Sequence, residues 1–170
     1  SPEWKLKKLL RAAYNFVKNI EPPPTLRQLT EQHRIPYYTL AHSDRTSLTE
    51  WLKEMQPDVI AIYKGPILEE AILQLPRHGT INIHPSHLPR YRGGHPILWM
   101  AYHMDFLAGT TVHFLDKGID TGDIIYQKLF PIELGMSEDA VEKLAVEQHG
   151  VPLMLRALDA IAEGNCPRIP

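Results

Sequence analysis

The sequence predicts an α/β fold in which helices flank a mostly parallel sheet. Segments with apolar residues at helical spacing alternate along the chain with short runs rich in β-branched residues. One of these runs, PDVIAIY at 57–63, is almost continuously apolar, which is typical of a strand buried on both faces in a parallel sheet. In such sheets ligands bind beyond the carboxyl ends of the strands.

The helices are expected from apolar spacing, capping residues and prolines. They cover 4–20, a segment starting near Thr25, 47–55, a short segment after Gly65, and 137–162. The prolines of EPPP at 21–24 end the first helix, because consecutive prolines remove backbone donors. Ser47, with Glu50 three residues later, has the spacing of a capping box. Pro66 suits the first turn of the fourth helix.

The last helix is expected to begin at Ser137, which can accept a hydrogen bond from the first turn. Pro152 is expected to kink this helix or divide it in two. Beyond the run at 57–63, strands are expected over 79–84, 109–116 and 123–130, with a short extended piece over 35–40. Three of the four strands are followed by loops rich in glycine, proline or charge: YKGP, HPSHLPRYRGGHP and DKGIDTGD.

Composition bounds the class of protein. The chain has 170 residues, 44% hydrophobic and 22% charged, which suits one globular domain over 1–170 with an atypical helix and proline-rich break in 1–24. A net charge of -2 gives no global basic footprint for nucleic acid or an acidic membrane. The single cysteine fits a reducing compartment, and no apolar run approaches the roughly 20 residues that span a bilayer. We therefore expect a cytoplasmic protein.

The stretch INIHPSHLPRYRGGHPI, residues 81–97, concentrates chemistry-bearing residues where a strand ends. Asn82 and His84 lie two residues apart, which on a strand puts both side chains on one face. An amide N–H can donate to developing negative charge, and an imidazole can move protons near neutral pH. Further along, Asp120 lies in the turn GIDTGD, where its carboxylate could orient the His84 ring and favour its protonated form.

The same loop allows other interpretations. Asn82 could cap a turn, and His84 could be a buried structural residue. Arg90 and Arg92 could hold a carboxylate or phosphate, or they could face solvent. A zinc site is a further alternative, although no HExxH motif or cysteine cluster accompanies it. Its ligands would be His84, His87 and His95.

Two motifs together resemble a known family. NIHPSHLPRYRGGHPI at 82–97 and GTTVHFLDKGIDTGDII at 109–125 resemble the folate-dependent formyltransferases, which include methionyl-tRNA, glycinamide ribonucleotide and sugar-nucleotide members. The stretch PDVIAIYKGPILEEAILQLPRHGTINIHPS at 57–86 looks like the segment ahead of the family's catalytic strand. The resemblance runs from about residue 25 to 165 and implies a Rossmann-like sheet.

The resemblance implies that N10-formyltetrahydrofolate donates a formyl group to a primary amine, without a metal. Asn82 and protonated His84 would stabilise the tetrahedral oxyanion, while Asp120 would hold His84 and support proton transfer. The residues implied to bind the donor are Tyr63, Lys64, Gly65, Pro66, Ile67, Asp116, Gly118 and Ile119. Those expected to bind the acceptor are Ser86, Arg90, Arg92 and Gly93.

The sequence departs from the family pattern at both ends. Members usually open with an apolar strand and a glycine-containing turn, whereas this sequence opens with the helical pattern at 4–20, so the sheet is expected to lack the family's first strand. Either the chain is a fragment, or the helix replaces the strand, or a second copy in a homo-oligomer covers the exposed edge. After the last helix the sequence ends at PRIP, without the further domain that methionyl-tRNA members would imply.

The expected lack of that domain and the net charge of -2 make nucleic acid an unexpected partner, and the charge likewise gives no reason to expect a membrane. DTGD at 120–123 resembles the methionyl-tRNA and sugar members more than the glycinamide ribonucleotide member, which favours a small-molecule amine, such as an amino sugar, as the acceptor. Two alternatives stay open. A formyltetrahydrofolate hydrolase would use water as acceptor, and a non-catalytic member would bind the folate without turnover. Formyl release measured with and without an amine separates the three functions.

Overall fold

The computed structural model describes residues 24–39 and 45–170. They belong to two compact units, before and after residue 44, which are described separately. In the first unit, helix α2 (Leu26–Gln32) follows Thr25, and the two residues of the cap bond reciprocally: the Thr25 hydroxyl accepts the Gln28 N–H, and the Gln28 side chain accepts the Thr25 N–H. This capping box confirms the predicted helix start.

Of the other predictions for the N-terminal part, only the extended piece at 35–40 falls largely on described residues. Residues 35–39, expected to be extended, form no strand. The helix predicted over 4–20, the proline-rich break at 21–24 except Pro24, and the expected absence of a first strand lie outside the described residues. Those predictions therefore remain predictions.

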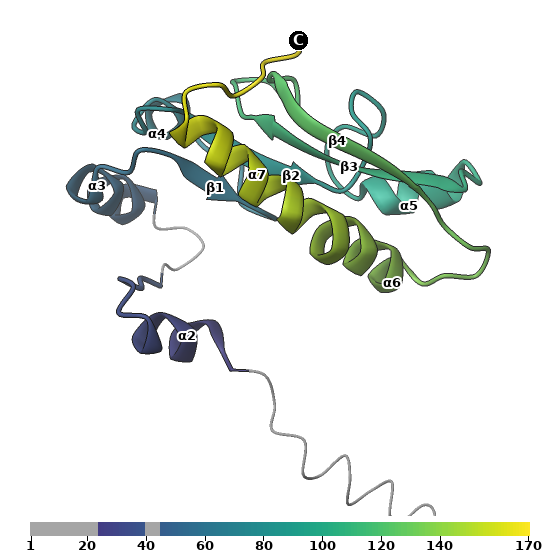
Figure 1. Ribbon diagram of the computed structural model, residues 1–170, viewed down its shortest axis with the longest axis horizontal. Helices are drawn as coiled ribbons and strands as arrows, with labels where there is room; N and C mark the ends of the chain where they lie inside the picture. Colours follow the sequence, from purple (N-terminus) through teal and green to yellow (C-terminus); the bar gives the residue numbers. More distant parts are fainter. Residues whose placement is uncertain (1–23, 40–44) are drawn as a thin grey trace, which may run out of the picture. The chain divides into compact units, whose positions relative to one another are not determined.

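The second unit is an α/β unit built on four described strands (Figure 1). Its elements are α3 (Arg45–Met55), β1 (Ile60–Ile62), α4 (Glu70–Leu73), β2 (Thr80–His84), α5 (Pro96–Tyr102), β3 (Leu107–Phe114), β4 (Ile124–Pro131), α6 (Glu138–Lys143), the π-helical segment η1 (Leu144–Gly150) and α7 (Val151–Ala162). The strands lie in the order β1-β2-β3-β4. The predicted α/β class and the four predicted strands are confirmed.

The prediction of a mostly parallel sheet is wrong for the described strands. Strand β1 pairs with β2 in parallel, but β2 with β3 and β3 with β4 are antiparallel. Strand β3 is buried from Ala108 to Phe114, because both of its faces are covered, and such burial does not report strand direction. The connection over 115–123 is shorter than the dozen or so residues that a parallel crossover needs.

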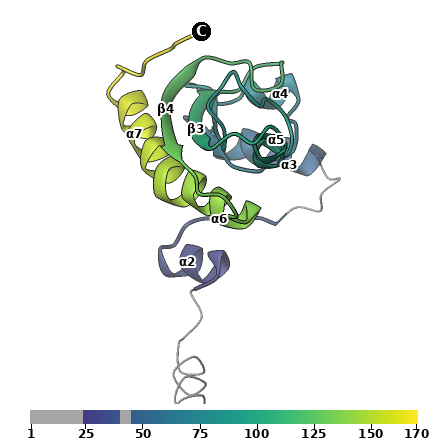
Figure 2. The same cartoon turned by 90° about the vertical axis from the view of Figure 1, so that its right-hand side faces the viewer.

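The helical run α6–η1–α7 lies along one side of the sheet (Figures 1 and 2). Ser137 caps its start by accepting the Ala140 N–H at 3.2 Å, as predicted. The run is divided as expected near Pro152, because η1 precedes it and regular α-helix resumes at Val151. Gly150 lets this run approach β2 closely, since a Cβ there would lie 2.7 Å from Cγ2 of Ile83.

Two helix predictions need correction, and one helix was not predicted. Helix α3 begins at Arg45, so Ser47 lies within it and is not its N-cap. Helix α4 begins only at Glu70. Lys64 has a left-handed φ of 53°, and the backbone at Glu69 is still extended, so no helix starts at Pro66. Pro66 therefore precedes the helix. Helix α5, which begins at Pro96 within a segment read as loop, was not expected.

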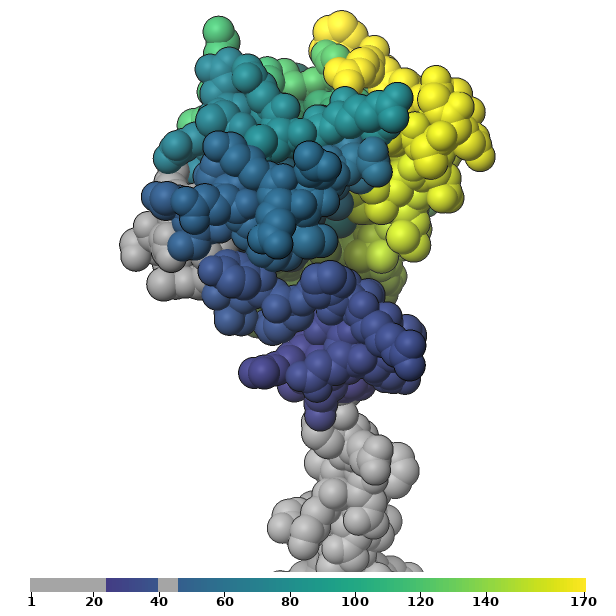
Figure 3. Space-filling model, turned by 90° about the vertical axis from the view of Figure 1, so that its left-hand side faces the viewer, coloured from purple at the N-terminus to yellow at the C-terminus, as the bar shows by residue number. Residues whose placement is uncertain are grey.

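The C-terminal residues are attached to the sheet beyond α7. Ile169 forms an antiparallel bridge with Ile124, and the Arg168 guanidinium lies 3.8 Å from the centre of the Phe114 ring. A hollow of about 450 Å³ is lined by Phe114 and Arg168 on this side and by Arg77 and His78 of the turn before β2. Figure 3 looks onto this end of the unit, and none of the predicted catalytic residues lines the hollow. Within the described part of the chain, no helix has the length and apolar character to cross a membrane.

A buried polar network attaches the loop after β2 to strand β3. The Thr111 hydroxyl donates to the Ser86 carbonyl at 2.7 Å and accepts the Leu88 N–H at 3.1 Å. From β4, the Gln127 amide donates to the Leu88 carbonyl at 2.7 Å and to the Thr111 hydroxyl at 3.0 Å. Because buried polar groups are costly when left unbonded, β3 and β4 fix the course of this loop.

Thr111→Val is expected to lower the free energy of unfolding by about 1–3 kcal/mol, because it leaves the buried Ser86 carbonyl and Leu88 N–H without this partner. Thr110→Val is the matched control: the Thr110 hydroxyl is also buried but has no hydrogen-bond partner in residues 45–170, so its loss should be neutral or stabilising. Urea unfolding of the three proteins measures both effects. Equal destabilisation by the two variants would contradict the role of the network.

Candidate active site

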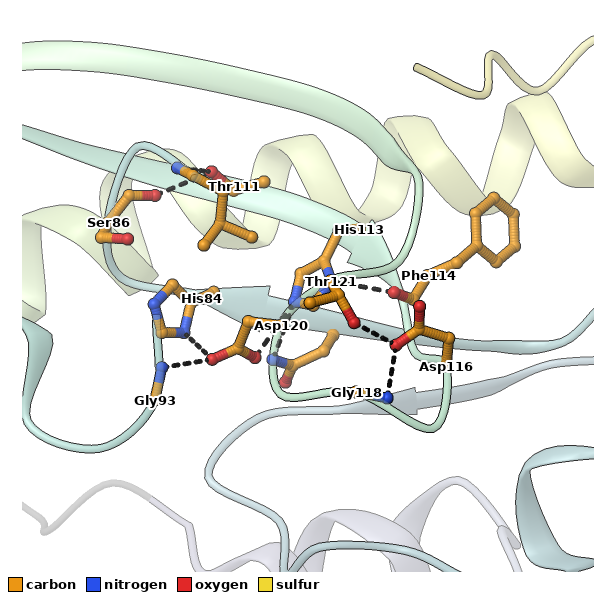
Figure 4. A network of polar contacts seen from close by, with 12 residues as sticks. His84, Ser86, Gly93, Thr111, His113, Phe114, Asp116, Gly118, Asp120 and Thr121 are labelled. Atoms are coloured by element: carbon orange, nitrogen blue, oxygen red, sulfur yellow. Dashed lines mark hydrogen bonds and ion pairs between the residues drawn. The ribbon is translucent and has the colours of Figure 1, made fainter. Parts of the chain in front are cut away.

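Asp120 forms the centre of a polar cluster that contains His84 and Gly93 (Figure 4). It lies on the connection between β3 and β4, whereas Asn82 and His84 lie on β2. The Asp120 carboxylate accepts the Gly93 N–H at 2.7 Å, and the same oxygen lies 3.5 Å from Nδ1 of His84. The side chains of His84 and Asp120 are 6% and 13% exposed, so this contact is only weakly screened by water.

Both ring nitrogens of His84 face acceptors. Nε2 lies 2.8 Å from the backbone carbonyl of Tyr91, and Nδ1 faces the Asp120 carboxylate. A carbonyl oxygen and a carboxylate can only accept hydrogen bonds, so the ring meets both partners when each of its nitrogens carries a proton. The geometry thus supports the predicted association of His84 with Asp120.

A second histidine, His113 on β3, completes the cluster and was missed from the sequence. Its ring is fully buried, with Nε2 at 3.3 Å from Nδ2 of Asn82 and 3.6 Å from the second oxygen of Asp120. The antiparallel register places His113 opposite Asn82, so both side chains share one face. With β3 assumed parallel to β2, this pairing could not be found.

Burial lowers the pKa of His113 below its ordinary value of 6.5, and although the Asp120 carboxylate opposes this shift, nearby His84 adds to it. At this residue the folded chain therefore binds fewer protons than the unfolded chain when the pH falls below about 6.5. Stability contributed by neutral His113 is present at higher pH and is lost as the pH drops. His149, whose pKa is also lowered mainly by burial, acts in the same direction.

We expect His113→Phe to reduce the pH dependence of stability. The wild-type chain should lose thermal stability between about pH 7.5 and about pH 5.5, and the variant should lose less, because it has no buried imidazole to protonate at position 113. Thermal unfolding of both proteins at the two pH values measures the difference. His149 is present in both, so its contribution cancels. An equal loss in both proteins would show that His113 does not resist protonation.

The connection that carries Asp120 is stabilised by its own side chains. One oxygen of Asp116 accepts the Gly118 N–H at 2.9 Å and the Thr121 hydroxyl at 2.6 Å. A Cβ at Gly118 would lie 2.0 Å from the Thr121 hydroxyl oxygen, so any larger residue at 118 would displace the Thr121 side chain from Asp116. Asp116 and Gly118, predicted to bind the donor, therefore shape the loop that presents Asp120. Ile119, also predicted, is exposed.

The predicted donor loop after β1 contacts helix α6. The Glu142 carboxylate accepts the Tyr63 hydroxyl and lies 2.5 Å from Nζ of Lys64. Hydrogen bonds from Lys64 and Tyr63 lower the pKa of Glu142, and burial beside Glu142 raises the pKa of Tyr63. The loop is thus held at one end, while Gly65, Pro66 and Ile67 are exposed.

The four predicted acceptor-binding residues have different environments. Ser86 is fully buried and donates from its hydroxyl to the Arg90 carbonyl at 2.7 Å. The Arg90 guanidinium lies 2.6 Å from the Asp105 carboxylate. Gly93 donates its N–H to Asp120. Arg92 is exposed and has no ion-pair partner in residues 24–39 or 45–170. Of the two arginines it is therefore the one whose charge is not paired with a carboxylate.

The alternative zinc site does not form in the described residues. No three histidine, cysteine, aspartate or glutamate side chains are grouped there in a way that could hold a metal ion. His84 instead makes the contacts with Tyr91 and Asp120 given above.

The fold and the cluster together define the class of this protein. It is an α/β protein in which an amide, a histidine and a carboxylate converge near the end of a strand, an arrangement that can stabilise an oxyanion and move a proton. A family model described as formyl transferase matches residues 12–158, and the chain belongs to this family. The family resemblance of the two motifs is thereby confirmed.

Curated relatives and solved structures give the same family. The methionyl-tRNA formyltransferase of Pelotomaculum thermopropionicum is 35% identical over 155 residues, covering 88% of this chain and 48% of the relative. That of Geobacter metallireducens is 38% identical over 119 residues, covering 69% of this chain and 38% of the relative. The chain thus spans about half the length, or less, of the curated relatives it matches.

Among solved structures, phosphoribosylglycinamide formyltransferase from Streptococcus pneumoniae is similar with a TM-score of 0.66 and 25% identity, over 81% of this chain and 82% of that one. A formyltetrahydrofolate deformylase from Pseudomonas syringae pv. tomato has a TM-score of 0.67 and 27% identity, over 78% of this chain and 47% of that one.

Proposed function

We propose that the protein transfers a formyl group from N10-formyltetrahydrofolate to a primary amine. The observation that carries the proposal is the Asp120 carboxylate, which bonds Gly93 and faces His84 within a formyl transferase family fold. Formyltetrahydrofolate is in the name of the similar Pseudomonas syringae deformylase, which supports the same donor here.

In the proposed mechanism the neutral amine attacks the formyl carbon, and the carbonyl electrons move to oxygen. Asn82 donates from its amide to this oxyanion, while His84 exchanges the Tyr91 carbonyl at Nε2 for the same oxygen and keeps Asp120 at Nδ1. Collapse of the intermediate breaks the bond from carbon to N10. The proton lost by the amine reaches N10 through the His84–Asp120 pair, directly or through a water.

For donor binding we propose the two loops implied by the sequence. Tyr63 and Lys64, held by Glu142, fix the start of the first loop, and Gly65, Pro66 and Ile67 offer exposed backbone and apolar surface to the pterin. The second loop contributes Asp116, Gly118 and Ile119, and its internal hydrogen bonds keep it preformed.

For the acceptor we propose the amine of methionyl-tRNA, because the curated relatives described above are methionyl-tRNA formyltransferases. The local charge supports a phosphate-bearing acceptor. Arg92 directly precedes Gly93, and Lys117 lies three residues before Asp120. Both side chains are exposed and have no ion-pair partner in the described residues. This acceptor differs from the small amine expected from the sequence alone.

A small amine remains the second candidate acceptor. The similarity to the Streptococcus pneumoniae phosphoribosylglycinamide formyltransferase covers 82% of that enzyme, which is named for a small acceptor. This chain therefore matches most of the length of an enzyme with a small acceptor in its name. Hydrolysis is the third candidate, favoured by the Pseudomonas syringae deformylase.

One assay separates these candidates. The chain is incubated with N10-formyltetrahydrofolate and either methionyl-tRNA, glycinamide ribonucleotide, a nucleotide-linked amino sugar or no amine, and tetrahydrofolate release is followed. We expect release that depends on methionyl-tRNA. Release only with a small amine would assign the second acceptor class, and release without amine would assign a hydrolase. Donor binding without release under every condition would contradict catalysis by this chain.

With the acceptor that supports tetrahydrofolate release, kcat should fall by about 10²–10⁴-fold in each of three variants: Asn82→Ala, His84→Ala and Asp120→Ala. Each removes a group that stabilises the oxyanion or moves the proton. Far-ultraviolet circular dichroism confirms that the variants fold. Retention of wild-type kcat in folded His84→Ala would contradict the mechanism.

Arg92→Gln is expected to raise the KM for methionyl-tRNA by about 3- to 10-fold and to weaken its salt dependence, with kcat almost unchanged, because one phosphate contact is lost. Arg77→Gln is the matched control, since Arg77 is an exposed arginine on the turn before β2, outside the site. Initial rates at two salt concentrations measure both variants. An unchanged KM in Arg92→Gln would remove Arg92 from acceptor binding.

A further inference from the structure

His113 has a defined set of partners that no step of the proposed mechanism uses. Its Nδ1 lies 2.8 Å from the carbonyl of Phe114, and its Nε2 lies 3.3 Å from Nδ2 of Asn82. The ring is fully buried, so water cannot replace either partner. Each hydrogen bond of His113 must therefore be accounted for within the protein.

The Phe114 carbonyl determines which nitrogen of His113 carries the proton. A carbonyl oxygen can only accept, so Nδ1 must donate to it. In the neutral ring Nε2 is then an acceptor, and the group that faces it must be a donor. The Asn82 amide meets this requirement with its nitrogen, so the His113 tautomer sets which end of the Asn82 amide points toward β3.

This orientation matters for the proposed role of Asn82. One amide N–H is used by His113, and no other hydrogen-bond partner of the Asn82 side chain occurs in the described residues. The second N–H is then available at a fixed angle to a ligand oxygen. If His113 carried its proton on Nε2, the Asn82 amide would have to turn its oxygen toward His113, and both of its N–H groups would then point in other directions.

The titratable groups that face His113 are Asp120, His84 and Asp116. Burial, the main effect, lowers the pKa of His113, so the neutral ring is favoured even beside two carboxylates. A neutral His113 with an unprotonated Nε2 donates no hydrogen bond to Asp120. His84 is then the imidazole whose Nδ1–H can be directed at this carboxylate, and the two histidines have different roles.

We propose that His113 is a positioning residue. Its neutral ring, protonated on Nδ1, fixes the Asn82 amide so that a side-chain N–H points at the reacting oxygen. Because His113 donates no hydrogen bond to Asp120, that carboxylate interacts with His84. The role of the reacting oxygen rests on the proposed function. The tautomer and the orientation of Asn82 do not, and they can be tested on the chain without substrate.

The first test is ¹⁵N NMR of the ¹⁵N-histidine-labelled chain, with the His113 signal assigned by its absence in His113→Gln. We expect a neutral ring with the proton on Nδ1 at about pH 8 and still at about pH 7. A proton on Nε2, or an imidazolium at neutral pH, would overturn the proposal whether or not the chain catalyses formyl transfer. His78→Gln is a matched control that should leave the His113 signal unchanged, because His78 lies on the turn before β2.

The second test measures coupling between His113 and Asn82 in the formyl-transfer assay. His113→Phe should lower kcat by about 10- to 100-fold with little change in the KM for the donor, because a misplaced N–H loses its effect on the oxyanion. His113→Gln should retain most of the activity, since its amide oxygen can accept from Asn82 where Nε2 does. In an Asn82→Ala background, His113→Phe should cost less than about 3-fold.

Two results of the second test would overturn the proposal. One is an equal loss from His113→Phe with and without Asn82, which would show that His113 does not act through the amide. The other is equal loss in His113→Phe and His113→Gln despite native folding. Absence of turnover in the wild-type chain would instead count against the proposed function, and the NMR result would still decide the tautomer.

Discussion

The site depends on how one carboxylate is shared. Asp120 accepts the Gly93 N–H at 2.7 Å with an oxygen that also faces His84, and its other oxygen faces His113. These contacts join three segments that are separate in sequence: the end of β2 with the loop after it, strand β3, and the connection to β4. A carboxylate in a largely buried cluster needs such donors, because removing a charge from water is costly unless it is bonded. The contacts of Asp120 with Gly93 and His84 therefore fix the course of the loop and the position of the His84 ring.

The sheet supplies the rigidity that this arrangement needs. Strand β3 is covered on one side by the helical run that includes η1, and on the other by the loop after β2, which Thr111 and Gln127 fasten. Gly109 permits the close approach of that loop, since a Cβ there would lie 2.6 Å from Cβ of His87. Residues that the sequence suggested as acceptor ligands, such as Ser86 and Arg90, serve this attachment in the structure through the Arg90 carbonyl and Asp105.

Much of this could be read from the sequence, and the rest depends on strand direction. The β2 pair Asn82 and His84, the turn with Asp120 and the cap at Ser137 follow from local spacing, and the structure places each as expected. His113 could not be found, because its contact with Asn82 requires an antiparallel register, and uniform burial of β3 conceals strand direction. The short connection over 115–123 was the available indication. Glu142 was missed for a similar reason, since its partners Tyr63 and Lys64 are distant in sequence.

The most direct test of the central claim is a crystal structure of the chain with a non-reactive analogue of N10-formyltetrahydrofolate. The account predicts that the oxygen of the formyl-like group lies within about 2.7–3.1 Å of the Asn82 amide nitrogen and of a ring nitrogen of His84, with Asp120 still facing that ring. An analogue bound with this group away from Asn82 and His84, or a His84 ring separated from Asp120 in the complex, would contradict the claim that this carboxylate-centred cluster is the site of formyl transfer.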